Sequence, residues 1–194
     1  MARRDVGGFE EPRFARLLFA STSWPVFIWL AIRLYLGYEW LRAGIEKVSD
    51  PAWWDGTAVQ GFATFASTEL TQGEHPPVAF GWYAAFLRWI ADTGYPVVGP
   101  IVAVGEVVIG ALLLLGLFTG IAAFLAATLT LTFGLAGSAG LNPLFLVFEM
   151  LLILAWRNAG YIGLDRWVLP ALGTPWQRGY LWRREEPDGH PTGA

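Results

Sequence analysis

The sequence predicts an all-α integral membrane protein that crosses the bilayer four times as a compact four-helix bundle. Hydrophobic residues make up 55% of the chain, and only 15% of the residues are charged. The mean hydropathy of +0.45 is higher than a soluble domain with a polar surface would have. The 11 tryptophans suit a protein with long membrane–water boundaries, where indole rings prefer to lie.

Four apolar segments are long enough, or nearly so, to cross about 30 Å of hydrocarbon as helices. The first is unusually rich in charged residues, the second and fourth carry isolated glutamates, and the third has no ionisable group. We expect these four spans at residues 24–47, 95–118, 121–138 and 143–158.

The segment between the first two spans, residues 49–94, is too long for a simple turn. Within it, residues 58–70 and 80–91 place apolar side chains at helical spacings, and a GEHPP motif separates them. We therefore expect two short interfacial helices in this first outer loop. The tryptophans that would anchor them are Trp53, Trp54, Trp82 and Trp89.

The distribution of basic residues predicts the orientation. Four arginines lie in residues 1–23 and several more follow the last span, whereas residues 49–94 contain Arg88 and five acidic residues. The positive-inside rule then places both ends in the cytoplasm and the acidic loop outside. We expect a retained cytoplasmic segment at 1–23, a membrane domain at 24–170 and a cytoplasmic tail at 171–194.

The composition narrows the possible chemistry. The chain has no cysteine, which excludes disulfides, iron–sulfur clusters and thiolate metal sites within it. Its two histidines, His75 and His190, fall in a loop and in the tail, so no pair of them could bind haem or copper inside the membrane. No flavin, zinc or dinucleotide motif is present, and no nucleic-acid partner is expected. Any electrons must pass between bound small molecules or partner subunits.

Ionisable side chains inside the hydrocarbon cost roughly 2.5–3.5 kcal/mol each, so they normally face protein or water and are paired. Counting residues from the span ends places Arg33 and Glu106 near the midplane, with Glu39, Arg42 and Glu149 nearer the outer surface. Arg33 and Glu106 are expected to meet, either as a structural ion pair that fixes helix register or as part of an anion site or proton path.

The first span carries two stripes of residues at helical spacing. The glycines of the first stripe would allow a neighbouring helix to approach closely, so this span is expected to lie in the interior. The first stripe consists of Arg33, Gly37, Trp40, Gly44 and Lys47, and the second of Glu39, Arg42 and Glu46.

A second set of charges could form a site near the outer surface. Arg42, Lys47 and His75 could converge where a small anion or a quinone head enters, and Glu39 and Glu149 could accept protons there. The alternative is that Arg42 and Lys47 only extend their charges to the interface. The candidate catalytic residues are Glu39, Arg42 and Glu149, and the candidate substrate or quinone contacts are Arg33, Trp40, Lys47, His75 and Glu106.

Three segments of the chain resemble the DoxX/DoxD family. IRLYLGYEWLRAGIEKV resembles the first helix of that family, and VGEVVIGALLLLGLFTGIAAFLAA resembles its second and third helices, with Glu106 in the characteristic place. RNAGYIGLDRWVLPALGTPW resembles the segment that closes the fourth helix. The resemblance covers residues 32–176, and the long loop at 49–94 resembles the DoxD-type subunit.

The resemblance implies a multi-pass protein of a prokaryotic plasma membrane. In better-understood members it implies a subunit of thiosulfate:quinone oxidoreductase, which joins two thiosulfates into tetrathionate and passes electrons to quinone as co-substrate. Thiosulfate is a dianion that needs arginine or lysine, and quinone reduction needs protons that membrane carboxylates could supply. Other membrane subunits or a homo-oligomer are expected partners.

Two other kinds of function remain open. One is a non-catalytic accessory subunit of a larger respiratory or photosynthetic complex. The other is a small transporter, which the sequence favours less because the four spans show no inverted repeat and no helix interrupted at mid-membrane.

Overall fold

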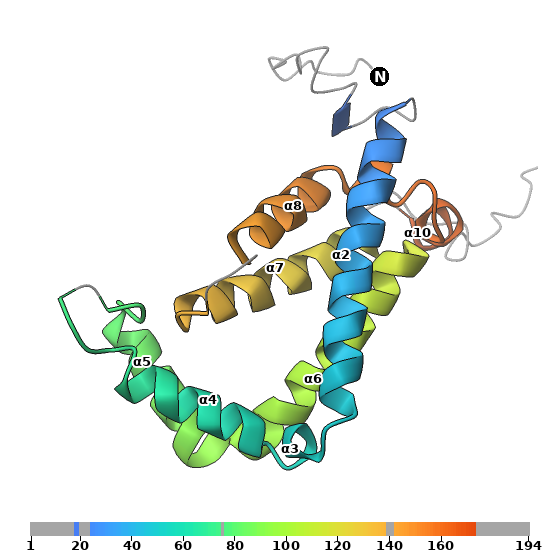
Figure 1. Cartoon of the computed structure of the whole chain (residues 1–194). Helices are drawn as coiled ribbons and strands as arrows, with labels where there is room; N and C mark the ends of the chain where they lie inside the picture. Colours follow the sequence, from blue (N-terminus) through green and yellow to red (C-terminus); the bar gives the residue numbers. More distant parts are fainter. Residues whose placement is uncertain (1–17, 20–23, 75, 139–141, 174–194) are drawn as a thin grey trace, which may run out of the picture.

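The computed structural model describes residues 18–19, 24–74, 76–138 and 142–173 (Figure 1). These residues form helices and turns and contain no strand, which confirms the all-α class. In chain order the elements are α2 (Pro25–Val48), α3 (Pro51–Trp54), α4 (Thr57–Thr68), α5 (Gly81–Trp89), the π-helical turn η1 (Ile90–Gly94), α6 (Tyr95–Leu115), α7 (Thr119–Leu135), α8 (Asn142–Leu154), α9 (Trp156–Ala159) and α10 (Asp165–Leu172).

Helices α2, α6, α7 and α8 coincide with the four apolar segments expected from the sequence. Helix α6 continues α5 and η1 without a break, giving one 35-residue helix from Gly81 to Leu115. In the described part of the chain this is the one helix that is long and apolar enough to cross a membrane. Helices α7 and α8 are apolar but shorter, and α2 is long enough but carries five charged residues.

The largest interface in the described part lies between α2 and α6, which run antiparallel. Glycines on both helices let the backbones touch: a Cβ at Gly44 would meet the backbone nitrogen of Val107, and one at Gly110 would meet the backbone of Leu41. The structure therefore confirms the close helix approach expected from the glycines of the first span.

Helices α7 and α8 pack on one side of this pair (Figure 1). Four of the six buried residues of α7 are alanines, which lets α8 approach it closely. Trp29 and Trp40 of α2 belong to the same core cluster. The alanines are Ala122, Ala123, Ala126 and Ala127.

Helices α4 and α5 lie side by side along an arm that leaves the α2–α6 pair near α3 (Figure 1). Asp50 caps α3 by accepting a hydrogen bond from the Ala52 backbone N–H. The Tyr83 hydroxyl donates to the Thr132 carbonyl over 2.6 Å and ties the arm to α7. Helix α4 confirms the first helix expected in residues 49–94, whereas the second expected helix, at residues 80–91, forms the start of the 35-residue helix that continues through α6.

Apolar side chains cover the outer faces of the long helices. On α6, Val97, Ile101, Val104 and Val108 follow each other at helical spacing, and all four are exposed, with Ile101 64% accessible. Helix α7 exposes Ile121 and Phe124, and α8 has a similar row. Soluble monomers rarely expose such continuous apolar rows, so these faces fit contact with lipid.

Candidate functional site

The expected ion pair between Arg33 and Glu106 does not form. Because α2 and α6 are antiparallel with Gly44 against Val107, Glu106 lies near the end of α2, and Arg33 lies beside Gly116 at the end of α6. Counting from the span ends places Arg33 and Glu106 at one depth only if the ends of the two helices are aligned. The backbone contacts of the glycines set a different register.

Arg33 instead joins α2 to the C-terminal part of the bundle. Its guanidinium is buried and donates to the carbonyl oxygens of Ala159 over 2.9 Å and of Ile162 over 2.7 Å. It fills the space beside Gly116, whose positive φ of 62° ends α6, and a Cβ there would collide with the guanidinium. Two backbone carbonyls thus hold Arg33, which is 2% exposed, while its Nε has no hydrogen-bond partner among the described residues. We call this the Arg33 end of the bundle.

A buried carboxylate strengthens the same end. Asp165, the first residue of α10, accepts hydrogen bonds from the backbone N–H groups of Phe118 over 2.6 Å and of Thr119 over 2.9 Å. These are the free donors at the start of α7, where a negative charge is stabilising. Nearby, Asn158 donates to the Leu18 carbonyl. The Asp165 contacts hold the start of α10 against the start of α7, and the Asn158 contact holds α9 against Leu18.

Lys47 and Glu106 form the ion pair at the opposite end of α2, the Lys47 end. Lys47 Nζ lies 2.7 Å from Glu106 Oε2, and the carboxylate is only 1% exposed while the lysine is 21% exposed. The lysine ammonium also lies 5.1 Å from the centre of the Trp53 ring, a cation–π contact. In this pair the Lys47 ammonium is partly accessible, whereas the Glu106 carboxylate is buried inside the bundle.

Glu149 lies deeper, at the centre of α8, and is fully buried. Its Oε1 accepts hydrogen bonds from Trp40 Nε1 over 2.9 Å and from Thr130 Oγ1 over 3.1 Å. Its Oε2 has no hydrogen-bond partner among the described residues. A buried polar atom left without a partner is costly, so this oxygen is a place where a proton or a ligand would be stabilised.

A small polar cavity of about 190 Å³ connects these groups. It is lined by Lys47 and Glu106 and also by Trp40 and Thr130, the two side chains that donate to Glu149. A molecule in this cavity would therefore contact the ion pair and both donors. We call it the polar cavity. Its lining consists of Glu39, Trp40, Ala43, Lys47, Glu106, Thr130, Phe133 and Phe145.

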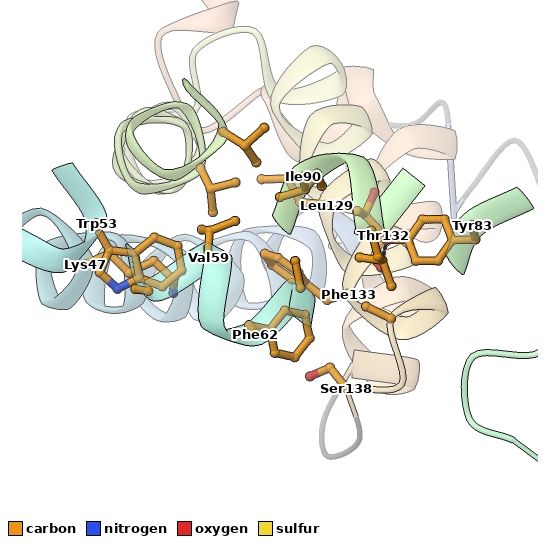
Figure 2. A pocket seen from close by; sticks show the side chains of 16 residues that line it. Lys47, Trp53, Val59, Phe62, Tyr83, Ile90, Leu129, Thr132, Phe133 and Ser138 are labelled. Carbon is orange, nitrogen blue, oxygen red and sulfur yellow. Dashed lines mark hydrogen bonds between the residues drawn. The ribbon is translucent and has the colours of Figure 1, made fainter. Parts of the chain in front are cut away.

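A second, larger cavity of about 330 Å³ lies between the arm and α7 (Figure 2). Its walls are almost wholly apolar, including Val59, Phe62 and Leu129, while Lys47 and Trp53 lie together at one edge. Lys47 and Phe133 line both this apolar cavity and the polar cavity. The ion pair therefore lies where a polar space and an apolar space adjoin.

Arg42 does not belong to either cavity. It lies on the outer face of α2, 52% exposed, and pairs with Glu39 over 3.1 Å and with Glu46 over 2.8 Å. The expected convergence of Arg42 with Lys47 is therefore absent, since Lys47 pairs with Glu106, and only Glu39 of the stripe also lines the polar cavity. His75 lies outside the described residues.

Three polar residues of these contacts escaped the sequence analysis. Thr130 is one of several threonines on α7, and nothing in the sequence distinguishes it as the one that faces Glu149. Asn158 and Asp165 are buried polar residues. Asp165 stands in the GLDR segment that resembles the family's ending, and its position at the start of a short helix was the available signal.

The helical fold, the long apolar helix and the exposed apolar faces define a helical protein of the membrane. A family model described as DoxX matches residues 28–139, more than half of the chain. The chain therefore belongs to the DoxX family, which is membrane-associated. No curated protein and no solved structure matches it.

Proposed function

We propose that this chain is a DoxD-like, quinone-linked subunit of a membrane oxidoreductase, with the quinone bound at the Lys47 end. The observation that carries the proposal is the Lys47–Glu106 ion pair, which lies where the polar and apolar cavities adjoin. A quinone needs this combination, because its ring has polar carbonyls and its tail is an apolar isoprenoid chain.

The proposal places α2, α6, α7 and α8 across a prokaryotic plasma membrane as a four-span bundle. The exposed apolar rows of α6, α7 and α8 support this arrangement. Helix α2 can span despite its charges because Arg33 is enclosed by protein groups and Lys47 is paired. The basic residues at the chain ends support a cytoplasmic location for both ends.

In the proposed site the quinone ring accepts a hydrogen bond from Lys47, and its tail lies in the apolar cavity. Reduction of the ring consumes two electrons and two protons. Glu39 is 23% exposed and lines the polar cavity together with Glu106, so protons can enter beside Glu39 and reach Glu106. Phe133, shared by both cavities, would contact the ring.

The electrons would come from two thiosulfates, which join through a new sulfur–sulfur bond to form tetrathionate and release two electrons. The polar cavity does not suit this dianion, because Glu106 balances the charge of Lys47 and Glu39 adds a negative charge. We therefore propose that thiosulfate is oxidised outside this cavity, on a partner subunit or where that subunit meets this chain.

The test is the reduction of a short-chain quinone by the purified chain with thiosulfate, with and without its copurifying subunits. The proposal expects thiosulfate-dependent loss of quinone absorbance in the complex, and a drop of about tenfold or more for Glu106→Gln. Arg88→Gln, on the outside of α5, is the control and should keep full turnover. Equal turnover in both variants would contradict the proposed role of the Lys47 end.

An accessory role is a second candidate, and the outer face of α2 favours it. Glu39, Arg42 and Glu46 form an exposed ionic stripe on a helix that we place in the membrane. Charged groups at that depth normally face protein or water. A partner that copurifies in fixed ratio and is lost on Arg42→Leu, with no quinone binding by this chain, would establish the accessory role.

A further inference from the structure

We propose that the Arg33 end binds an anionic phospholipid, independently of any redox role. One acyl chain would lie in a third cavity, between the start of α7 and α10, and the phosphate would contact Arg157 and Arg166. The inference depends on the shape of this cavity, on one buried hydroxyl and on two arginines.

The cavity has a volume of about 430 Å³, within the usual range for sites that hold small molecules. Its walls are largely apolar, with Ile121 and Ile153 on one side and Leu169 and Leu172 of α10 on the other. Because Ile121 also belongs to the exposed apolar face of α7, the cavity is continuous with the surface that faces lipid.

One polar group inside the cavity is free to bind a ligand. The Thr119 hydroxyl is completely buried, lines the cavity and has no hydrogen-bond partner among the described residues. The Asp165 carboxylate also lines the cavity, but two backbone N–H groups already donate to it. The ligand chemistry that suits this arrangement is an apolar chain carrying an acceptor oxygen, such as a lipid ester.

Two exposed arginines lie next to lining residues. The Arg157 guanidinium stacks over Trp156, which lines the cavity, at 5.1 Å from the ring centre. Arg166 follows Asp165, and its guanidinium lies 5.3 Å from the centre of the Tyr161 ring and 5.8 Å from that of Trp167.

The charge of these arginines is available for a ligand. In the described part of the chain neither guanidinium belongs to an ion pair. The aromatic rings hold both side chains in place, so they lose little freedom on binding. Two fixed cations beside an apolar cavity are complementary to an anionic headgroup, and a zwitterionic lipid would gain less because its own cation repels them.

Native mass spectrometry of the purified full chain tests the proposal. The chain is equilibrated with equal amounts of phosphatidylglycerol and phosphatidylcholine that have the same acyl chains. We expect one phosphatidylglycerol to be retained in preference to phosphatidylcholine. The double variant Arg157→Gln/Arg166→Gln should lower that retention by about thirtyfold, since each basic residue near a headgroup contributes about 1 kcal/mol.

Two further variants separate the site from general charge effects. Arg88→Gln removes one exposed arginine from the arm, far from α10 in the sequence, and should retain phosphatidylglycerol as the wild type does. Thr119→Val keeps the shape of the side chain, leaves both arginines and should still weaken retention. Circular dichroism confirms that each variant is folded. Equal retention of both lipids by the wild type, or unchanged retention by the double variant and by Thr119→Val, would overturn the proposal.

Discussion

The Arg33 end and the Lys47 end of α2 each bury a charged side chain, but their surroundings differ. Arg33 donates to two backbone carbonyls and fills the space beside Gly116, so its guanidinium is enclosed by the chain itself. Lys47 and Glu106 are paired, yet they border two cavities. The Arg33 guanidinium is closed in by protein and can hold the fold together, whereas the Lys47–Glu106 pair itself borders space for a ligand.

Replacing Arg33 should have the largest effect on stability. Arg33→Ala removes two charge-assisted hydrogen bonds and opens a void between α2, α6 and the segment after α9, so we expect a loss of about 3–5 kcal/mol. Thermal unfolding in detergent measures it. Arg33→Lys, which can keep one of the two bonds, should lose roughly half as much. A normal melting temperature for Arg33→Ala would show that the enclosed guanidinium does not hold this end together.

Breaking the ion pair at the Lys47 end should have a smaller effect. Lys47→Met leaves Glu106 buried without its cation, and we expect a loss of about 2–3 kcal/mol, below the usual cost for a fully buried pair because Lys47 is partly exposed. Lys47→Met/Glu106→Leu should recover most of the stability. The recovered variant should not bind quinone, which would separate folding from function. Quinone binding by it would contradict the assignment of the pair.

The hydrogen bonds to Glu149 offer a finer comparison. Trp40→Phe and Thr130→Val each remove one donor to the same oxygen, and each should cost about 1–2 kcal/mol, the ordinary value for a bond to a buried acceptor. A double-mutant cycle of Trp40→Phe with Glu149→Leu, which removes the acceptor, measures the coupling by chemical denaturation. A coupling near zero would mean that the Trp40 bond contributes nothing.

Substitution in the exposed stripe on α2 should have the smallest effect on stability. Arg42→Gln breaks two exposed ion pairs, and such pairs contribute about 0–1 kcal/mol. We expect a melting temperature of the isolated chain, and a quinone turnover of the complex, close to those of the wild type. A large loss of turnover by a folded Arg42→Gln variant would restore the sequence-based hypothesis that Arg42 is catalytic.

The sequence was sufficient to predict the helices and the buried face of α2. Runs of apolar residues mark the long helices, and Gly37, Trp40 and Gly44 are buried as their spacing predicts. Those features are local, since they depend on residues three or four apart in one helix.

The pairing of charges was not predictable, because it depends on register between helices. A shift of about four turns between α2 and α6 decides whether Glu106 meets Arg33 or Lys47, and the contacts of Gly44 and Gly110 set the register. The role of Asp165 also depends on the tertiary structure, since this residue caps helix α7, which begins 46 residues earlier. The partners of both groups lie far away along the chain.

Equilibrium binding of a short-chain quinone to the purified chain tests the central claim most directly. Ala63 lies in the wall of the apolar cavity and is almost completely buried, so Ala63→Leu fills part of that space. The account predicts that the wild type binds quinone, and that Ala63→Leu and Glu106→Gln each weaken binding by about tenfold while Arg88→Gln does not. Binding of equal strength in all four proteins would show that quinone does not occupy the Lys47 end.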